Sequence, residues 1–427
     1  MGISMQNQAN AFWSLIEAFS GPLFGMLMIP ILIKAIGIAG YGEFVMLMAL
    51  VGLLAFSGFG MNTTITYFLA SQTNTQSSED IAQKLVTALC ITLVGTLSVS
   101  LILLLTFHFA SGYLALNYPK LYVAKNDLPY VFLYLIISQA DSVLSAAFKG
   151  LQAFSLSSRL EFAIRFMVFI ANVASAMIFK SITLILMSLV VFSAIGLYIR
   201  LKFICKLPHL YLGRYLKRAF CNKVHFKEQL KFGRWMVVQV VAASLYSSLD
   251  KIIIGSVMGT SVAGVYNVLL SVTQFVHIIP ANSMGFVFSK LTKNKYALTF
   301  NMLKTLSRIV FSSAIIVAAL LFIGRPVIFN KLHIHNDYIF LFNGLLISHI
   351  LLAINIPLYY MALSDNKIKA VSIQCLAGAL LGILFLILTI KPLGLWSAIG
   401  SKLIYSILAL FLLIPVINIL RSRLHEN

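Results

Sequence analysis

The chain has 427 residues, of which 60% are hydrophobic and only 10% are charged, and its formal net charge is +20. Soluble domains are about 45–50% apolar and about 25% charged, so the composition excludes that class. The apolar runs are also too long for a transmembrane β-barrel, whose strands alternate over short segments. The sequence therefore predicts an all-α integral membrane protein that crosses the bilayer many times.

Apolar runs separated by polar, Gly or Pro clusters predict about twelve membrane-spanning helices. They cover residues 11–36, 43–70, 85–108, 128–149, 160–179, 182–204, 232–255, 261–288, 303–323, 338–363, 368–390 and 394–419. The first of them is not preceded by a basic segment and is not followed by a small-residue cleavage site. We therefore expect it to be a retained helix and not a signal peptide.

Lys and Arg are distributed unevenly among the segments between these spans. With a cytoplasmic N-terminus, 21 of them fall in cytoplasmic segments, 8 fall on the opposite side and three lie inside spans. Cytoplasmic loops of membrane proteins carry the excess of Lys and Arg. The bias predicts an N-in/C-in topology. The orientation in the membrane therefore accounts for most of the positive charge, and nucleic-acid binding is not needed to explain it.

The longest polar segment, residues 205–231, follows six predicted spans and separates an N-terminal half, 1–204, from a C-terminal half, 232–427. Its basic character is typical of a cytoplasmic linker on anionic lipid headgroups; a regulatory or partner-binding segment is the alternative. The halves open with similar residues: Phe12, Trp13, Gly37, Gly40 and Tyr41, and then Phe232, Gly233, Trp235, Gly259, Gly264 and Tyr266. Two six-span repeats of equal orientation predict a central cavity between them.

Four short motifs resemble those of Wzx-type polysaccharide flippases: Gly37-Ile-Ala-Gly-Tyr-Gly42, Phe232-Gly-Arg-Trp, Asp250-Lys-Ile-Ile-Ile-Gly255 and Gly264-Val-Tyr266. That family shares a superfamily with the MATE exporters and the lipid II flippase. The resemblance implies alternating-access export of undecaprenyl-pyrophosphate-linked O-antigen units from the cytoplasmic to the periplasmic leaflet of a bacterial inner membrane. It also implies an O-antigen polymerase and a chain-length regulator as partners, whereas the basic linker predicts contact with anionic inner-membrane lipids.

Polar side chains recur at steps of three or four residues along five predicted spans, which places them on one face of each helix. These stripes are Ser14, Glu17, Gly21 and Gly25; Ser138, Asp141, Ser145, Lys149 and Gln152; Glu161, Arg165, Asn172 and Ser175; Gln239, Ala243, Tyr246 and Asp250; and Asn267, Ser271, Gln274 and His277. Stripes that contain a charge predict a hydrated lumen, whereas single Ser or Asn side chains favour interhelical hydrogen bonds in a dry bundle.

Ionisable groups inside a bilayer cost several kcal/mol unless they are paired or hydrated, so each is a functional candidate. A lipid diphosphate needs cationic contacts, and sugar hydroxyls need hydrogen-bonding groups. The predicted substrate-binding residues are Arg165, Lys149, Arg308, Lys402, Asn172 and Gln274. For Arg165 and Arg308 a structural anchor at the membrane surface competes with this role.

The sequence contains no GxxxxGK[ST] motif, which excludes a P-loop ATPase, and it predicts no cofactor or metal. Coupling to an H⁺ or Na⁺ gradient needs a carboxylate whose charge changes with conformation, and Glu17, Asp141 and Asp250 are the candidates. Uncoupled downhill movement is the alternative, and Asp250 with Lys251 could instead form an interfacial pair. The hinge candidates are Gly21, Pro22 and Pro30; the seventh span has no proline.

Two other functions compete with the flippase interpretation. A MATE-like cation-coupled drug exporter would favour carboxylates over cations in its cavity. An O-antigen polymerase or ligase would hold catalytic residues in a long periplasmic loop. The predicted periplasmic loops are short, and His333, His335 and Asp337 lack a supporting scaffold, so a transporter without catalytic residues is the favoured interpretation.

Overall fold

The computed structural model describes residues 5–70, 77–109, 124–206, 221–281, 300–332, 334–364 and 368–417, and these residues contain helices and no strands. Eleven helices among them are long and apolar enough to cross a membrane. The first, Ile16–Gly58, has 43 residues and a kink at Gly37, so it supplies two of the predicted spans. The predicted all-α membrane architecture is confirmed.

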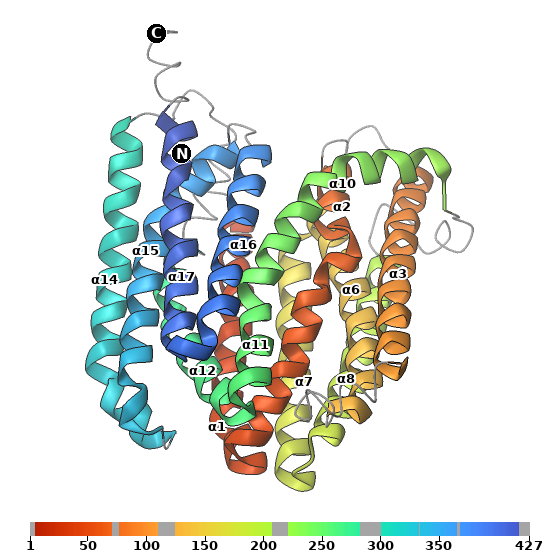
Figure 1. Cartoon of the computed structure of the whole chain (residues 1–427). Helices are drawn as coiled ribbons and strands as arrows, with labels where there is room; N and C mark the ends of the chain where they lie inside the picture. Colours follow the sequence, from red (N-terminus) through yellow and green to blue (C-terminus); the bar gives the residue numbers. More distant parts are fainter. Residues whose placement is uncertain are drawn as a thin grey trace. The chain divides into compact units, whose positions relative to one another are not determined.

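Contacts divide the chain into two compact units, unit 1 (Met1–Val240) and unit 2 (Val241–Asn427) (Figure 1). The division falls within a continuous helical segment in which α10 (Lys223–Ser244) leads through a π-helical turn (Leu245–Leu249) into α11 (Asp250–Met258). Residues 207–220 of the predicted linker lie outside the described residues, and residues 223–231 form the start of α10. The helix thus begins earlier than the predicted seventh span. Lys, Glu and Gln are too polar to be counted in an apolar span, but their helix propensity is high.

The central helix of unit 1 is α6 (Leu128–Gly150). It packs against α1 (Met5–Leu53), α2 (Met61–Ala70), α3 (Ser78–Phe109), α7 (Phe154–Phe179) and α8 (Ile182–Cys205). Small side chains let membrane helices approach closely. The buried face of α6 accordingly mixes small and branched residues, which include Val131, Leu135, Ala140, Val143, Leu144, Ala146 and Ala147.

The predicted second span, 43–70, is interrupted in the structure. After α1 ends at Leu53, a 3₁₀ turn covers Leu54–Gly58, and Phe59 and Gly60 adopt positive φ angles of 51° and 62° before α2 begins. Uniform apolar composition hides such a break, because hydropathy does not report backbone conformation. The break turns α2 into a separate short helix whose Asn62, Thr63 and Thr66 line a cavity described below.

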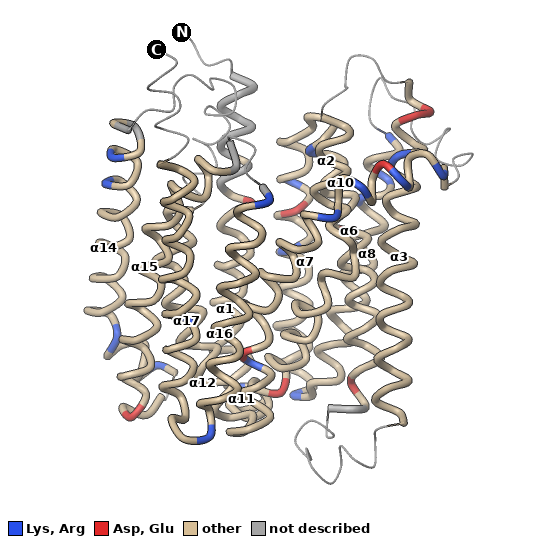
Figure 2. The backbone as a smooth tube through the Cα atoms, turned by 45° about the horizontal axis from the view of Figure 1, so that its top comes forward, with Lys and Arg blue, Asp and Glu red and all other residues tan. Residues whose placement is uncertain are grey.

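The start of α10 is fixed to unit 1 by both aromatic and polar contacts. The ring of Phe232 stacks on that of Tyr67, with centroids 4.3 Å apart. His225 Nε2 lies 3.2 Å from Asp80 Oδ1 at the beginning of α3, and Figure 2 shows the charged positions of α3 and α10 close together. The Phe232-Gly-Arg-Trp motif therefore begins where α10 packs on α2.

Unit 2 contains α11, α12 (Thr260–Thr273), α14 (Phe300–Lys331), α15 (Ile339–Ser364), α16 (Ile368–Leu393) and α17 (Trp396–Ala409). Helix α15 packs against α12, α14 and α17, and α16 lies along α17 (Figure 1). A core cluster of this unit consists of Ala242, Leu303, Leu358, Met361, Ala362, Val371, Cys375, Ala379, Leu412 and Val416. Residues 282–288 and 418–419 of the predicted eighth and twelfth spans lie outside the described residues.

A glycine separates the first two helical segments in each half of the chain. Gly37 has φ 76° and ψ 169°, and Gly259 has φ 109° and ψ 159°. Residues with a Cβ rarely adopt these angles. The backbone of α1 stays helical at Gly21, Pro22 and Pro30, and the break within this helix lies at Gly37; the hinge role of the first three residues stays a prediction.

The two glycines of α1 at positions 25 and 37 offer a matched test of this break. A Cβ added at either one meets no atom within 4 Å, so the two positions differ in backbone conformation and not in crowding. Gly37→Ala is expected to lower the free energy of unfolding by about 1–3 kcal/mol. Gly25→Ala is expected to leave it unchanged or to raise it by up to about 1 kcal/mol. Denaturant unfolding in detergent measures both, and equal effects would contradict the assignment.

Candidate functional site

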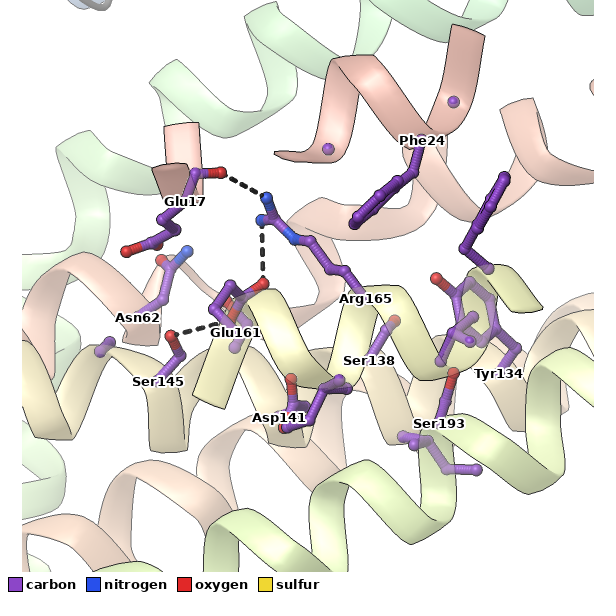
Figure 3. Close-up of a pocket in the computed structure, with 18 of the residues that line it drawn as sticks. Glu17, Phe24, Asn62, Tyr134, Ser138, Asp141, Ser145, Glu161, Arg165 and Ser193 are labelled. Atoms are coloured by element: carbon purple, nitrogen blue, oxygen red, sulfur yellow. Dashed lines mark hydrogen bonds and ion pairs between the residues drawn. The ribbon is translucent and has the colours of Figure 1, made fainter. Parts of the chain in front are cut away.

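A cavity of about 790 Å³ lies in unit 1, lined by residues of α1, α2, α6, α7 and α8 (Figure 3). The predicted polar stripes of the first, fourth and fifth spans converge on it. Its uncharged polar lining consists of Asn62, Thr63, Thr66, Tyr134, Ser138, Ser142, Ser145, Asn172 and Ser193. Phe24 and Phe169, whose ring centroids are 5.2 Å apart, contribute an aromatic part of the wall. The cavity thus offers both hydrogen-bonding groups and flat apolar surface.

An ion pair joins α1 and α6 at the cavity wall. Lys149 Nζ lies 2.6 Å from Glu17 Oε1, and Ser158 Oγ donates a hydrogen bond of 2.6 Å to Glu17 Oε2. The Lys149 side chain is 36% exposed and that of Glu17 is 14% exposed. A predicted substrate-binding cation and a predicted coupling carboxylate are therefore partners of each other.

Arg165 bridges α7 and α1. Its Nη2 lies 2.8 Å from Glu161 Oε1, and its Nη1 donates to the Glu17 carbonyl oxygen at 2.9 Å and to Ser20 Oγ at 3.0 Å. A Cβ added at Gly21 would lie 3.0 Å from Arg165 Nη1. Gly21, predicted as a hinge candidate, therefore leaves the space that the guanidinium occupies (Figure 3 shows the Arg165 contacts).

Arg200 holds three helices together and was not among the predicted site residues. Its Nε lies 2.7 Å from Asp141 Oδ1, and its Nη2 lies 3.1 Å from Asp141 Oδ2 and 2.8 Å from Glu161 Oε2. The Arg200 side chain is 0% exposed. Arg200 was assigned to the cytoplasmic segment after the sixth span, so a role inside the helix bundle was not predicted. A small residue four positions earlier, Gly196, was the available signal, because the two share the helix face that packs on α7.

The charges of this cavity form one network. Three carboxylates (Glu17, Asp141 and Glu161) and two cations (Lys149 and Arg165) line it, and Arg200 lies behind its wall as the third cation. Each of these carboxylates pairs with a cation at 2.6–2.8 Å. An anionic ligand must therefore compete with protein carboxylates for Lys149 and Arg165.

The other predicted substrate-binding residues have different surroundings. Asn172 lines the same cavity, and its Oδ1 accepts a hydrogen bond of 2.6 Å from Ser188. Arg308 is exposed on α14, and Gln274 is partly buried after the last residue of α12. These last two belong to unit 2 and do not line the unit 1 cavity.

Unit 2 contains its own buried ion pair. Lys402 Nζ on α17 lies 2.8 Å from Asp250 Oδ2, and the two side chains are 2% and 1% exposed. Tyr266 donates a hydrogen bond to the same carboxylate, and the backbone N–H of Lys251 donates to Asp250 Oδ1 at 2.8 Å. The predicted substrate contact Lys402 and the predicted coupling group Asp250 thus share one buried site.

A π-helical turn supplies a further partner for Lys402. The turn, Leu245–Leu249, directly precedes Asp250, and the Tyr246 carbonyl accepts a hydrogen bond from Lys402 Nζ. The same Nζ lies 3.8 Å from the centroid of the Tyr246 ring. A π-helical turn changes the usual i+4 pairing of backbone carbonyls, which makes one available to a side chain. The seventh span lacks proline but has this local irregularity instead.

The Arg200 network predicts a large cost for removing its cation. Arg200→Met leaves Asp141 and Glu161 without their buried partner, and we expect a loss of about 3–5 kcal/mol in the free energy of unfolding. Lys202→Met is the control, because Lys202 is exposed two residues further along the same helix. Thermal unfolding of the two purified variants measures the difference. A similar loss in both would show that Arg200 is not a structural cation.

The pair in unit 2 predicts non-additive stability. Lys402→Met alone leaves a buried carboxylate without its cation, and Asp250→Asn alone leaves a buried ammonium without its anion, so each is expected to destabilise by about 3–5 kcal/mol. The double variant removes both charges and is expected to lose less than the sum of the two. A double-mutant cycle of unfolding free energies measures this, and strict additivity would contradict the pairing.

Comparison with known proteins agrees with this architecture. The sequence matches a family described as "Polysaccharide biosynthesis protein" over residues 8–285. The comparison with curated proteins gave no match.

Among solved structures, the fold is similar to the MATE multidrug transporter DinF-BH (TM-score 0.71, 14% identity, covering 96% of this chain and 94% of that one). It is similar to a point mutant of the Vibrio cholerae MATE transporter VcmN (TM-score 0.64, 14% identity, 97% and 96%). It is also similar to the lipid II flippase MurJ in an inward closed conformation (TM-score 0.68, 16% identity, 96% and 90%).

These likenesses establish a MATE- and MurJ-like fold. The family match covers well over half of the chain and agrees with the resemblance seen in its motifs. The chain is a multi-pass membrane protein, and it belongs to the polysaccharide biosynthesis protein family.

Proposed function

We propose that the protein is a flippase that moves undecaprenyl-pyrophosphate-linked O-antigen oligosaccharides from the cytoplasmic to the periplasmic leaflet of a bacterial inner membrane. In this proposal the chain has an N-in/C-in topology, works by alternating access and leaves its substrate chemically unchanged. The observation that supports it best is the cavity of about 790 Å³ in unit 1, inside a membrane protein of the polysaccharide biosynthesis family.

The uncharged lining of the cavity suits an oligosaccharide. Hydroxyl and amide side chains such as Asn62, Thr66 and Ser138 can donate to and accept from sugar hydroxyls. The stacked rings of Phe24 and Phe169 can pack against the apolar face of a sugar ring. A pocket that combines a few polar groups with apolar surface fixes the orientation of its ligand.

Two cations of the cavity are available to contact the diphosphate of the substrate. Lys149 and Arg165 are each 36% exposed and line the cavity, so a ligand can reach them. Arg200 is fully buried, and Lys402 is held against Asp250 in unit 2. We therefore assign the diphosphate contacts to Lys149 and Arg165. The phosphate oxygens replace Glu17 and Glu161 as their partners.

The same exchange provides a route to ion coupling. A phosphate that takes Lys149 from Glu17 leaves a carboxylate without its cation, and such a carboxylate favours binding a proton or Na⁺. We propose Glu17 as the coupling carboxylate. Glu17→Gln is expected to abolish the gradient dependence of transport in vesicles, whereas Glu79→Gln, an exposed residue at the start of α3, is expected to retain it.

A MATE-like drug exporter is the second candidate, and the carboxylates of the cavity favour it. Glu17, Asp141 and Glu161 all line the space in which a cationic drug would bind. Efflux of a cationic dye from cells that express the protein tests this alternative. Efflux together with normal surface polysaccharide in a deletion strain would replace the flippase proposal.

Deletion of the gene tests the main proposal directly. We expect long-chain surface O-antigen to disappear and single lipid-linked units to accumulate inside the cell. Complementation with Lys149→Gln or Arg165→Gln is expected to restore about a tenth of the wild-type level or less, because each removes a charged contact. Lys202→Gln, on the exposed face of α8, is expected to restore it fully. Wild-type levels with both cavity variants would exclude the assigned contacts.

A further inference from the structure

A second cavity lies in unit 2, where α14 ends and α15 begins. Its volume is about 470 Å³. It is lined by Arg325, Pro326, Phe329, Asn330, Ile334, His335, Asn336 and Ile339. The floor is apolar, because Phe329 and Ile334 are only 4% and 7% exposed, and the remaining lining includes two amides, an imidazole and a guanidinium.

The charge of this cavity differs from that of the unit 1 cavity. Among the described residues that line it there is no carboxylate, and Arg325 carries the formal charge. Asp337, the nearby acidic residue, pairs with His335 at 2.9 Å and does not line the cavity. An anion that enters here meets Arg325 without a carboxylate on the cavity wall that competes for it, although Asp337 holds His335 Nδ1 from outside the wall.

Among the described residues, Arg325 has no strong partner. The described residues give it a 3.5 Å contact from Nη1 to Asn343 Oδ1 and the ring of Phe322, whose centroid lies 5.0 Å from its Cζ. By contrast, the cavity cations Lys149 and Arg165 have a carboxylate oxygen within 2.8 Å. A guanidinium has five N–H donors in a fork that matches phosphate oxygens, and the described residues occupy few of them.

The position of Arg325 suits the headgroup region of a bilayer. It lies six residues before the end of α14 at Lys331, which is about 9 Å along a helix. The neighbouring side chains Phe322, Ile323 and Val327 are 51%, 75% and 59% exposed, as expected for a lipid-facing surface. Figure 2 shows Lys and Arg positions near both ends of α14. The cavity therefore lies beside exposed apolar side chains near one end of a predicted span, a position that suits a lipid headgroup.

We propose that this cavity binds the phosphate of an anionic membrane lipid. Arg325 forms the charged contact, Asn330, Asn336 and His335 hydrogen-bond the headgroup, and Phe322 and Val327 lie against the acyl chains. The proposed site shares no lining residue with the unit 1 cavity, and it does not depend on the substrate proposed for that cavity. In the N-in topology it faces the periplasmic leaflet.

Native mass spectrometry of the full chain released from detergent tests the proposal with phosphatidylglycerol as the probe and phosphatidylcholine as the neutral comparison. Arg325→Gln is expected to lower retention of phosphatidylglycerol about tenfold, the loss of one charged contact. Lys331→Gln is the control, because Lys331 is exposed at the end of the same helix and does not line the cavity. Unchanged retention in Arg325→Gln, or an equal loss in Lys331→Gln, would overturn the proposal.

A second variant keeps the arginine and changes the charge beside it. Asn330→Asp places a carboxylate of nearly equal size in the cavity wall at an exposed position, so folding is expected to be unaffected. We expect it to lower retention of phosphatidylglycerol as well, because the new carboxylate pairs with Arg325. Unchanged retention would count against the site. Displacement of the lipid by millimolar inorganic phosphate would reassign the site to free phosphate.

Discussion

An ionised side chain inside a bilayer is stable only beside a group of opposite charge, and this requirement determines how the helices of unit 1 pack. Arg200 on α8 is fully buried and reaches Asp141 on α6 and Glu161 on α7. Water cannot replace either partner at low cost, so the three helices are held in one rotational setting. Glu161 then orients Arg165, which reaches the backbone of α1. The ion pairs thus add a directional constraint on the walls of the unit 1 cavity, which apolar contacts alone do not provide.

This arrangement also decides the character of the cavity. Because its cations are paired with carboxylates, the wall of the cavity is close to electrically neutral. In the proposed flippase, an anionic headgroup gains contacts only by exchanging partners, and that exchange links ligand binding to the charge state of Glu17. In unit 2 the charges of Lys402 and Asp250 are also paired, but the pair is buried and leaves no space for a ligand between the two side chains.

Hydropathy and the spacing of polar residues predicted the helices and the convergence of three polar stripes, because both depend on helical periodicity, which is local in sequence. The break at Phe59 and Gly60 was not predictable in this way, since it involves no change in composition. Arg200 was missed because counting it by topology ignores which helix face it occupies. Partner choice, such as Lys149 with Glu17 across 132 positions, depends on tertiary packing that a single sequence does not report.

The π-helical turn of Leu245–Leu249 carries a consequence for the segment as a whole. One extra residue in a helical turn rotates everything after it by about 100° around the helix axis. Upstream of the turn, Ala242 is buried in the core cluster of unit 2; downstream of it, Asp250 faces Lys402 in the same unit. Removing a single residue from this turn would carry the carboxylate away from its ammonium, whatever the residue was. The number of residues in the turn Leu245–Leu249 is therefore constrained more tightly than their identity. The length of the turn determines the angle around the helix axis between the contacts before it and the contacts after it.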